Sequence, residues 1–100
     1  MPARRTEPEP GYRRGDGVEA REVDGIFFLI PPRTHEVCQL DQMASALWRV
    51  LSTPRSLSDL VALFEAAFPN TAKRRIEKDI ADLLVFLQQS RLIAKVRARS

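Results

Sequence analysis

The order of apolar and polar positions along the chain predicts strands first and helices afterwards. The dipeptide Asp24-Gly25 tolerates the positive φ angles of a tight hairpin turn, and it separates a weakly apolar stretch beginning at Val18 from a continuous apolar run, residues 26–30. Such a run is typical of a strand covered on both faces. Pro31-Pro32 ends this strand because proline has no amide hydrogen to donate, and residues 37–40 predict a third, short strand.

Two amphipathic segments of helix length follow the third strand. Asp41 is expected to cap the first helix, because its carboxylate can accept hydrogen bonds from the free amide groups of a helix start. Apolar residues then recur with helical spacing until Pro54 stops the helix. Ser56 and Asp59 have the spacing of a capping box, with Asp in place of the usual Glu, and predict a second helix that ends at Pro69-Asn70.

A third and longer helix is expected to run to about Ser90, with Asn70 or Thr71 as its cap. This helix has one stripe of apolar residues that is expected to face the core. Phe86 lies on the flank of that stripe, where it is expected to widen the core face or, alternatively, to line a groove. Leu92-Ile93 predicts a short returning strand or a packed tail. The stripe spans roughly 100° of the helix surface and consists of Ile76, Ile80, Leu83, Leu84 and Leu87. The order of elements places the chain in the α+β class.

With 100 residues the chain is expected to form one domain with a thin core. No apolar run approaches the roughly 20 residues of a membrane span, and the first residues lack the apolar core of a secretory signal. The single cysteine, Cys38, excludes an internal disulfide and indicates a reducing compartment, so a cytoplasmic location is expected. Residues 1–16, rich in Pro, Gly and charge, predict a flexible tail before a folded part, 17–96, and residues 97–100 predict a basic tail.

The net charge of +3 is distributed unevenly along the chain. Residues 1–14 hold four Arg and two Glu, and residues 91–100 hold four basic residues and no acid, which leaves residues 15–90 with a net charge of −3. The folded part is therefore expected to be mildly acidic, with the positive charge at its two ends. A DNA-binding domain usually gathers Lys and Arg on one folded face, so this distribution argues against nucleic acid as the partner.

The chain offers little for catalysis or for a metal ion. His35 and Cys38 are three positions apart, but a structural zinc site needs about four ligands, and the sequence has no second His or Cys. Cys38 lacks a base with an orienting partner, so it is expected to be a small buried apolar residue rather than a nucleophile. No glycine-rich loop lies between a strand and a helix. The sequence therefore predicts neither an enzyme nor a cofactor.

Several short motifs in a fixed order resemble the PqqD family. They are Leu40-Asp41, Ala46-Leu47-Trp48, the stretch 54–60, Ile76-Glu77-Lys78-Asp79-Ile80 and the final Leu92-Ile93. Each motif is short, and the resemblance depends on their common spacing over residues 18–96. Two positions depart from the family pattern. Asp41 replaces a frequent Asn, and Arg91 replaces the Gly before the final apolar pair, which puts the tight exit from the third helix in question.

The resemblance implies a RiPP recognition element: a winged-helix-like α+β domain with a three-stranded N-terminal antiparallel sheet followed by three helices. Such PqqD-like domains bind the leader segment of a ribosomally synthesised precursor peptide, without catalysis or a cofactor of their own. They act as peptide chaperones in RiPP or PQQ biosynthesis and present the precursor to a modifying enzyme, often a radical SAM protein. A free-standing chain of 100 residues is then expected to deliver the peptide to a separate enzyme or to dock on it.

In that family the leader adds as an extra strand beside the third strand, in a cleft lined by the third helix. Carried over by position, the implied site is Val37, Cys38, Gln39 and Leu40 on the strand, with Lys73, Arg74, Arg75, Ile76, Lys78, Asp79, Asp82 and Phe86 on the helix. A short edge strand has unpaired backbone groups, so a guest strand gains main-chain hydrogen bonds. The basic residues would meet acidic leader residues, and Ile76 or Phe86 apolar ones. Which basic side chain faces the cleft stays open, and the acids of this helix also have the spacing to pair with its bases on a solvated face.

Three other interpretations stay open from the sequence. A winged-helix transcription regulator would read DNA with the basic residues in 73–78 and with the basic C-terminal tail. A purely structural subunit would cover an apolar patch of a partner protein. Two copies paired through the exposed edge strand would form a dimer in place of a monomer.

Overall fold

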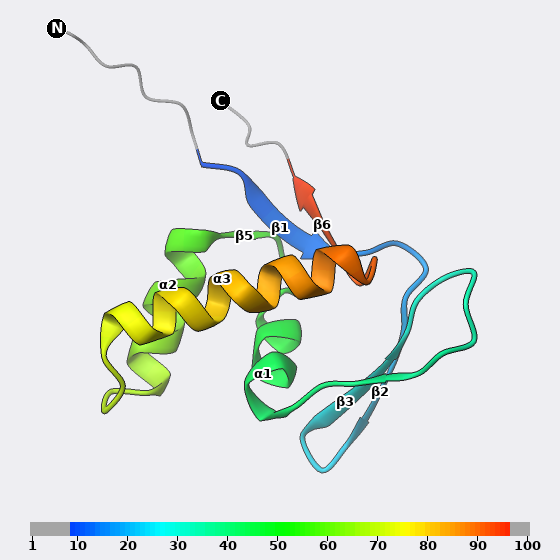
Figure 1. Cartoon of the computed structure of the whole chain (residues 1–100), viewed down its shortest axis with the longest axis horizontal. Coiled ribbons are helices and arrows are strands. Elements are labelled where there is room, and N and C mark those ends of the chain that lie inside the picture. Colours follow the sequence, from blue (N-terminus) through cyan, green and yellow to red (C-terminus); the bar gives the residue numbers. More distant parts are fainter. Residues whose placement is uncertain (1–8, 97–100) are drawn as a thin grey trace, which may run out of the picture.

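The computed structural model describes residues 9–96, which form two small antiparallel sheets and three helices (Figure 1). One sheet consists of β2 (Glu19–Val23), β3 (Ile26–Ile30) and β4 (Cys38–Gln39), in that order. The helices are α1 (Gln42–Val50), α2 (Leu57–Ala67) and α3 (Lys73–Gln89). The second sheet has the order β5 (Arg55–Ser56), β1 (Gly11–Arg14) and β6 (Ile93–Val96). The predicted α+β class, with a three-stranded antiparallel sheet before three helices, is confirmed.

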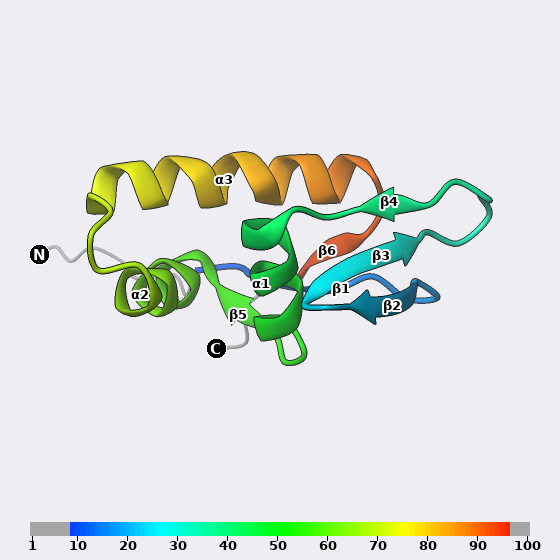
Figure 2. The same ribbon diagram turned by 90° about the horizontal axis from the view of Figure 1, so that it is seen from below.

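The β2–β3 hairpin turns at Asp24 and Gly25, whose φ angles of 51° and 84° are those of the predicted tight turn. The prediction that β3 is covered on both faces is wrong, since Leu29 is its one fully buried residue and every residue of β2 is exposed. The hairpin projects beyond the helices, so they cover only part of one face (Figure 2). β4 is shorter than the predicted strand, but the amide of Leu40 still donates to the Phe27 carbonyl at 2.9 Å.

The starts of the first two helices are capped as predicted. The Asp41 carboxylate accepts a hydrogen bond of 2.8 Å from the Ala44 amide at the start of α1. At the start of α2, Ser56 and Asp59 form a reciprocal capping box, in which the Ser56 hydroxyl accepts from the Asp59 amide at 3.1 Å. These local bonds fix where the chain leaves β4 and β5 and enters each helix.

The two ends of α3 differ from the prediction. Ala72 is the residue that precedes the helix, and it makes no side-chain cap, so the expected cap by Asn70 or Thr71 is wrong. At the other end Arg91 has a φ of 61°, and the amides of Arg91 and Leu92 donate to the carbonyls of Gln88 and Leu87. This pair of bonds is the Schellman motif, in which glycine is the usual residue at the position of Arg91. The tight exit therefore forms although the glycine is absent.

Residues 11–14 belong to the fold, so the prediction of a flexible tail over residues 1–16 is wrong for them. They form β1, which pairs with β6 on one side and with β5 on the other. The Arg14 guanidinium lies 4.6 Å from the centre of the Trp48 ring and donates twice to the Trp48 carbonyl, at 2.9 and 3.1 Å. Residues 1–8 and the predicted basic tail at 97–100 lie outside the described residues.

Because β1 and β6 belong to the folded part, its charge also differs from the prediction. Residues 9–96 hold twelve basic and twelve acidic residues, so the described part is neutral rather than mildly acidic.

The core lies between the three helices, with Leu29 reaching it from β3 and Ile93 from β6. Trp48 is buried within it, whereas Phe86 is 47% exposed, so the expectation that Phe86 widens the core face is wrong. No helix within residues 9–96 is long and apolar enough to cross a membrane. In the view of Figure 2, β4 lies near the C-terminal end of α3, and the chain that leads from β4 to α1 runs beneath the helix.

Candidate functional site

β4 is an edge strand. It pairs with β3, and within residues 9–96 no strand pairs with its other side. The bond from the Leu40 amide to the Phe27 carbonyl shows that Leu40 directs its backbone groups towards β3. Because this direction alternates along an antiparallel pair, Cys38 does the same, and Val37 and Gln39 direct their N–H and C=O groups away from the sheet. The free edge therefore offers two sets of backbone donors and acceptors.

One face of α3 borders this edge. Arg75, Asp79, Asp82 and Phe86 follow spacings of four, three and four residues, so they form one stripe along the helix. Arg75 and Asp79 line a cavity next to the start of α1, so the N-terminal part of this stripe is turned towards the chain that leaves β4. Lys73 and Arg74 are off the stripe, roughly 200° and 100° away from Arg75 around the helix. Of the three basic residues in the first turn of α3, Arg75 is thus the one that lines this cavity.

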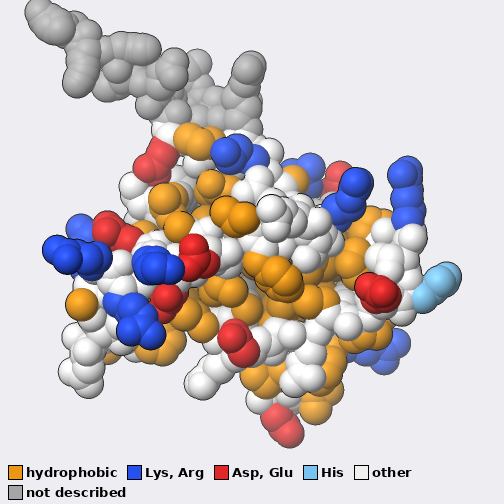
Figure 3. Space-filling model, viewed as in Figure 1, with side chains coloured by type: hydrophobic (Ala, Val, Ile, Leu, Met, Phe, Trp, Pro, Cys, Tyr) orange, Lys and Arg blue, Asp and Glu red, His pale blue; other side chains and the backbone are white. Residues whose placement is uncertain are grey.

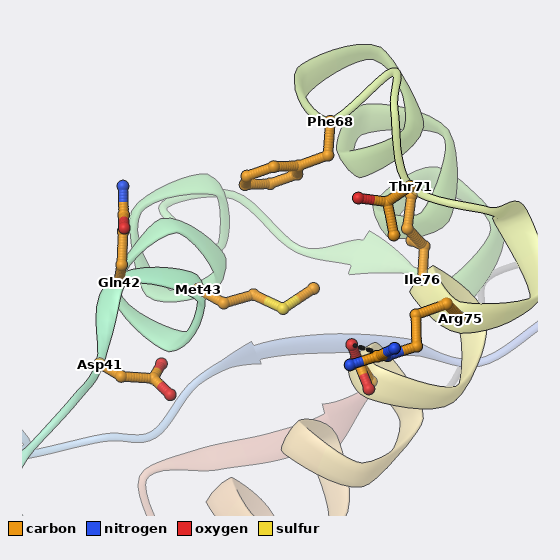
Figure 4. A pocket seen from close by; sticks show the side chains of 8 residues that line it. Asp41, Gln42, Met43, Phe68, Thr71, Arg75 and Ile76 are labelled. Atoms are coloured by element: carbon orange, nitrogen blue, oxygen red, sulfur yellow. Dashed lines mark hydrogen bonds and ion pairs between the residues drawn. The ribbon is translucent and has the colours of Figure 1, made fainter.

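The α1–α3 cavity has a volume of about 430 Å³ and lies where the C-terminal end of β4 meets the helices. Its lining is Asp41, Gln42, Met43, Phe68, Thr71, Arg75, Ile76 and Asp79. The Met43 thioether and the Phe68 ring point into the space between α1 and the start of α3 (Figure 4). The floor is apolar and the α3 side is charged, which suits an apolar side chain with a polar group beside it.

The charged residues of α3 are largely paired with one another. Arg75 contacts Asp79 at 3.3 Å and Lys78 contacts Asp82 at 2.8 Å, as expected for a solvated face. The hydrogen bond and the charge of Asp82 raise the pKa of the Lys78 ammonium group. Blue and red side chains consequently lie mixed over the N-terminal end of α3 (Figure 3). This end is therefore no unbroken positive surface.

A second and larger hollow adjoins the other end of β4. The β4–β6 crevice is an open space of about 1170 Å³ between Val37 and Cys38, the C-terminal turn of α3, the start of β6 and two loops, 13–16 and 31–36. Three arginines line it, Arg13, Arg33 and Arg91, together with the acids Asp16 and Glu36. The two hollows thus lie at opposite ends of the β4 edge.

Two local features shape the crevice. Gly15 donates its amide to the Leu92 carbonyl at 2.8 Å, and a Cβ atom at Gly15 would lie 3.1 Å from the carbonyl oxygens of Arg91 and Leu92. The close approach of these backbones therefore needs a glycine. Cys38 is half-buried rather than buried as predicted, and its partial burial raises the pKa of its thiol. Within residues 9–96 no three metal-ligating side chains lie together.

The predicted site residues divide into those that line the cavity or the crevice and those that line neither. Arg75, Ile76 and Asp79 line the cavity, and Val37 and Cys38 line the crevice. Leu40 and Ile76 are 2% and 0% exposed, so their side chains mainly belong to the core. Lys73, Arg74, Lys78, Asp82 and Phe86 are exposed on α3 and line neither hollow.

Sequence reasoning missed Met43 and Phe68 in the cavity and Arg33 and Arg91 in the crevice. Met43 is one of the apolar residues that recur with helical spacing in the first predicted helix. Its place directly after β4 and the α1 cap was the signal that it borders the strand edge.

Comparison with known proteins gives the fold and the family of the chain. The solved structure of TbiB1 in complex with the TbiA(beta) leader peptide superposes with a TM-score of 0.74 at 22% sequence identity, covering 81% of this chain and 93% of that chain. That likeness establishes a common fold. No curated protein sequence matches significantly. The family model described as "Coenzyme PQQ synthesis protein D (PqqD)" matches residues 27–93, which include β3, β4 and all three helices. The chain belongs to the PqqD family.

Proposed function

We propose that this protein binds the leader segment of a ribosomally synthesised precursor peptide as an additional strand on the free edge of β4, and presents that peptide to a separate modifying enzyme. The observation that carries the proposal is the free edge of β4 near the C-terminal turn of α3, where Gln39 directs its backbone groups away from β3. If the alternation continues, Val37 just before the strand does the same. A guest strand that pairs there gains main-chain hydrogen bonds, and neighbouring hollows select its side chains.

The sheet sets the direction of the guest. β2, β3 and β4 are antiparallel to one another, and sheets of a single type are favoured, so the guest runs antiparallel to β4. β4 runs from the β4–β6 crevice towards the α1–α3 cavity. The guest therefore enters at the cavity and leaves past the crevice.

The cavity provides the side-chain selection at the entry. An apolar side chain of the peptide fits between Met43 and Phe68, where it removes apolar surface from water. Arg75 lies beside it and is held by Asp79, so an acidic peptide residue has to compete with Asp79 for that guanidinium.

The proposal includes a binding role without catalysis, a cytoplasmic location and an enzyme partner of the radical SAM type. The family membership and the TbiB1 complex with a leader peptide support the binding role. The single cysteine supports a reducing compartment. The family resemblance supports the enzyme class.

The test uses a peptide that is selected for binding to this protein from a displayed library of random peptides. The peptides have about 15 residues. An extended strand as long as the 17-residue helix α3 needs roughly half that number, so each peptide can span the site and extend beyond it. Gln39→Pro removes the outward amide hydrogen without removing a bond to β3, and should weaken binding of the selected peptide about tenfold or more. Ala20→Pro is the matched control. Ala20 occupies the corresponding outward position on the free edge of β2, so its replacement should leave affinity unchanged.

Equal affinity of the Gln39→Pro variant, with its fold intact by circular dichroism, would contradict strand addition. Failure to select any peptide would contradict peptide binding altogether. A gel shift with genomic DNA fragments that weakens steeply with salt would favour the DNA-binding alternative instead.

A further inference from the structure

The β4–β6 crevice carries positive charge that has no acidic partner among residues 9–96. Arg13 is paired with Asp16 at 3.0 Å. Within residues 9–96 neither Arg33 nor Arg91 takes part in an ion pair, and Glu36 is the remaining acid of the lining. Two arginines and one glutamate without an ion pair among the described residues therefore line the same hollow.

Both free arginines sit at backbone positions that favour glycine. The φ angle of Arg33 is 68° and that of Arg91 is 61°, and a residue with a side chain is strained in this left-handed region. The described part of the chain has three such residues, and the third, Asp24, lies in the hairpin turn, where Asp is common. Strain retained at two positions that line one crevice is a reason to ask what these side chains do there.

The helix end explains only one of the two arginines. A positive charge at the C-terminal end of α3 is favoured by the helix dipole, which is an ordinary reason for Arg91. Arg33 lies in the loop between β3 and β4 and is not part of a helix, although it lines the same crevice as the C-terminal turn of α3. The crevice is what the two residues have in common.

From this we propose that the crevice binds acidic residues of the precursor peptide, positioned C-terminal to the segment that pairs with β4. The inference rests on the proposed function and adds the class of sequence that is recognised. Guanidinium groups bind carboxylates through paired hydrogen bonds, and the crevice adjoins Val37, where an antiparallel guest leaves the strand. The acidic residues would thus follow the apolar residue that occupies the α1–α3 cavity.

The test compares selections from the displayed random library on three proteins. The wild type should enrich Asp and Glu C-terminal to an apolar position, and the double variant Arg33→Gly/Arg91→Gly should lose this enrichment. The control Arg21→Ala/Arg74→Ala removes the same amount of positive charge from exposed positions outside the crevice, and should keep it. Arg33→Lys/Arg91→Lys, which retains both charges, should keep most of it.

Affinity and stability give a second readout. The double glycine variant should bind a selected acidic peptide about five- to thirtyfold more weakly, the loss expected for two partly exposed ion pairs. When Asp and Glu of that peptide are replaced by Asn and Gln, the double glycine variant and the wild type should bind the peptide with equal affinity. Its Tm should equal or exceed that of the wild type, because glycine relieves both left-handed positions.

Three results would overturn the inference: selections on the wild type without acidic enrichment, enrichment that survives in the double glycine variant, or a Tm of that variant well below the wild type. Each of them leaves peptide binding itself intact. A wild type that selects no peptide at all would remove the proposed function as well.

Discussion

Ser45 shows how a single buried hydroxyl connects the sheet to the helices. The side chain is 0% exposed, accepts a hydrogen bond of 2.9 Å from the Phe27 amide, and lies 3.5 Å from the Leu40 carbonyl, to which it donates. These are the two groups that would bond to each other if the β3–β4 ladder continued. Ser45 therefore closes the last rung of the ladder at the point where the chain turns into α1.

Replacing Ser45 by Ala should lower the free energy of unfolding by about 1–3 kcal/mol, because the partly buried Phe27 amide is left without a partner. For a domain of this size that is a fall in Tm of about 4–8 °C per kcal/mol, measurable by thermal unfolding. The exposed Ser52 is the matched control, and Ser52→Ala should stay within about 0.5 kcal/mol of the wild type. Equal stability of the two variants would contradict the bridging role.

Arg91 shows what a sequence departure can and cannot indicate. The sequence marks it as a replacement of glycine, which argued against a tight exit from α3. The exit forms nevertheless, because the buried residues Leu87 and Leu92 and the backbone contact with Gly15 hold the turn. The strain is tolerated because the packing around it is worth more.

At the scale of elements, the neighbours of β4 make it a candidate binding strand. Two residues of regular pairing make a weak strand, and its sequence alone marks it as short. Its position beside α3, between the cavity and the crevice, is what makes its free edge a candidate binding site.

Amide hydrogen exchange followed by NMR tests the assigned alternation along β4. In the free protein the amides of Cys38 and Leu40 should exchange more slowly than those of Val37 and Gln39, because only the first pair is bonded to β3. Adding the selected peptide should slow Val37 and Gln39. The outward amide of Ala20 on β2 should be unaffected. Unchanged exchange at Val37 and Gln39 under saturating peptide would argue for binding elsewhere on the protein.

α3 combines structural and binding roles on different faces. Its buried stripe, with Ile76, Ile80, Leu84 and Leu87, was predictable from spacing alone. Its cleft-facing stripe was not, because periodicity shows which side is apolar and leaves open which neighbour lies along each flank. The same limit explains Phe86, which was expected to widen the core face or to line a groove, and which is exposed and lines neither hollow.

At the scale of the whole molecule, β1 and β6 join the two ends of the described chain. β1 pairs with β5 before α2 and with β6 after α3, and Arg14 binds the Trp48 carbonyl at the end of α1. This small sheet thereby fixes the C-terminal end of α3, and with it one wall of the β4–β6 crevice.

Deleting residues 1–16 should therefore lower the Tm by more than about 10 °C, since β6 loses its strand partner and the Arg14 bonds are lost. Deleting residues 1–8 is the control, and it leaves every described contact in place. Thermal unfolding of both truncated chains measures the difference. If the two deletions had equal effects, β1 would contribute nothing to stability.

The sequence by itself determined the α+β class, the hairpin at Asp24-Gly25, the caps of α1 and α2, and the apolar stripe of α3. These features depend on contacts between residues a few positions apart, so spacing and side-chain type are sufficient to specify them. The motifs also sufficed to indicate the family.

Only the tertiary structure decided that residues 11–14 form a strand, that Arg75 rather than Lys73 lines the cavity at the start of α1, and that Arg33 and Arg91 share a crevice. Each of these joins residues distant in the chain, and short polar strands such as β1 acquire their conformation from the partners they pair with. The local pattern around β1 gave no sign of those partners, because β6 lies about 80 residues further along the chain.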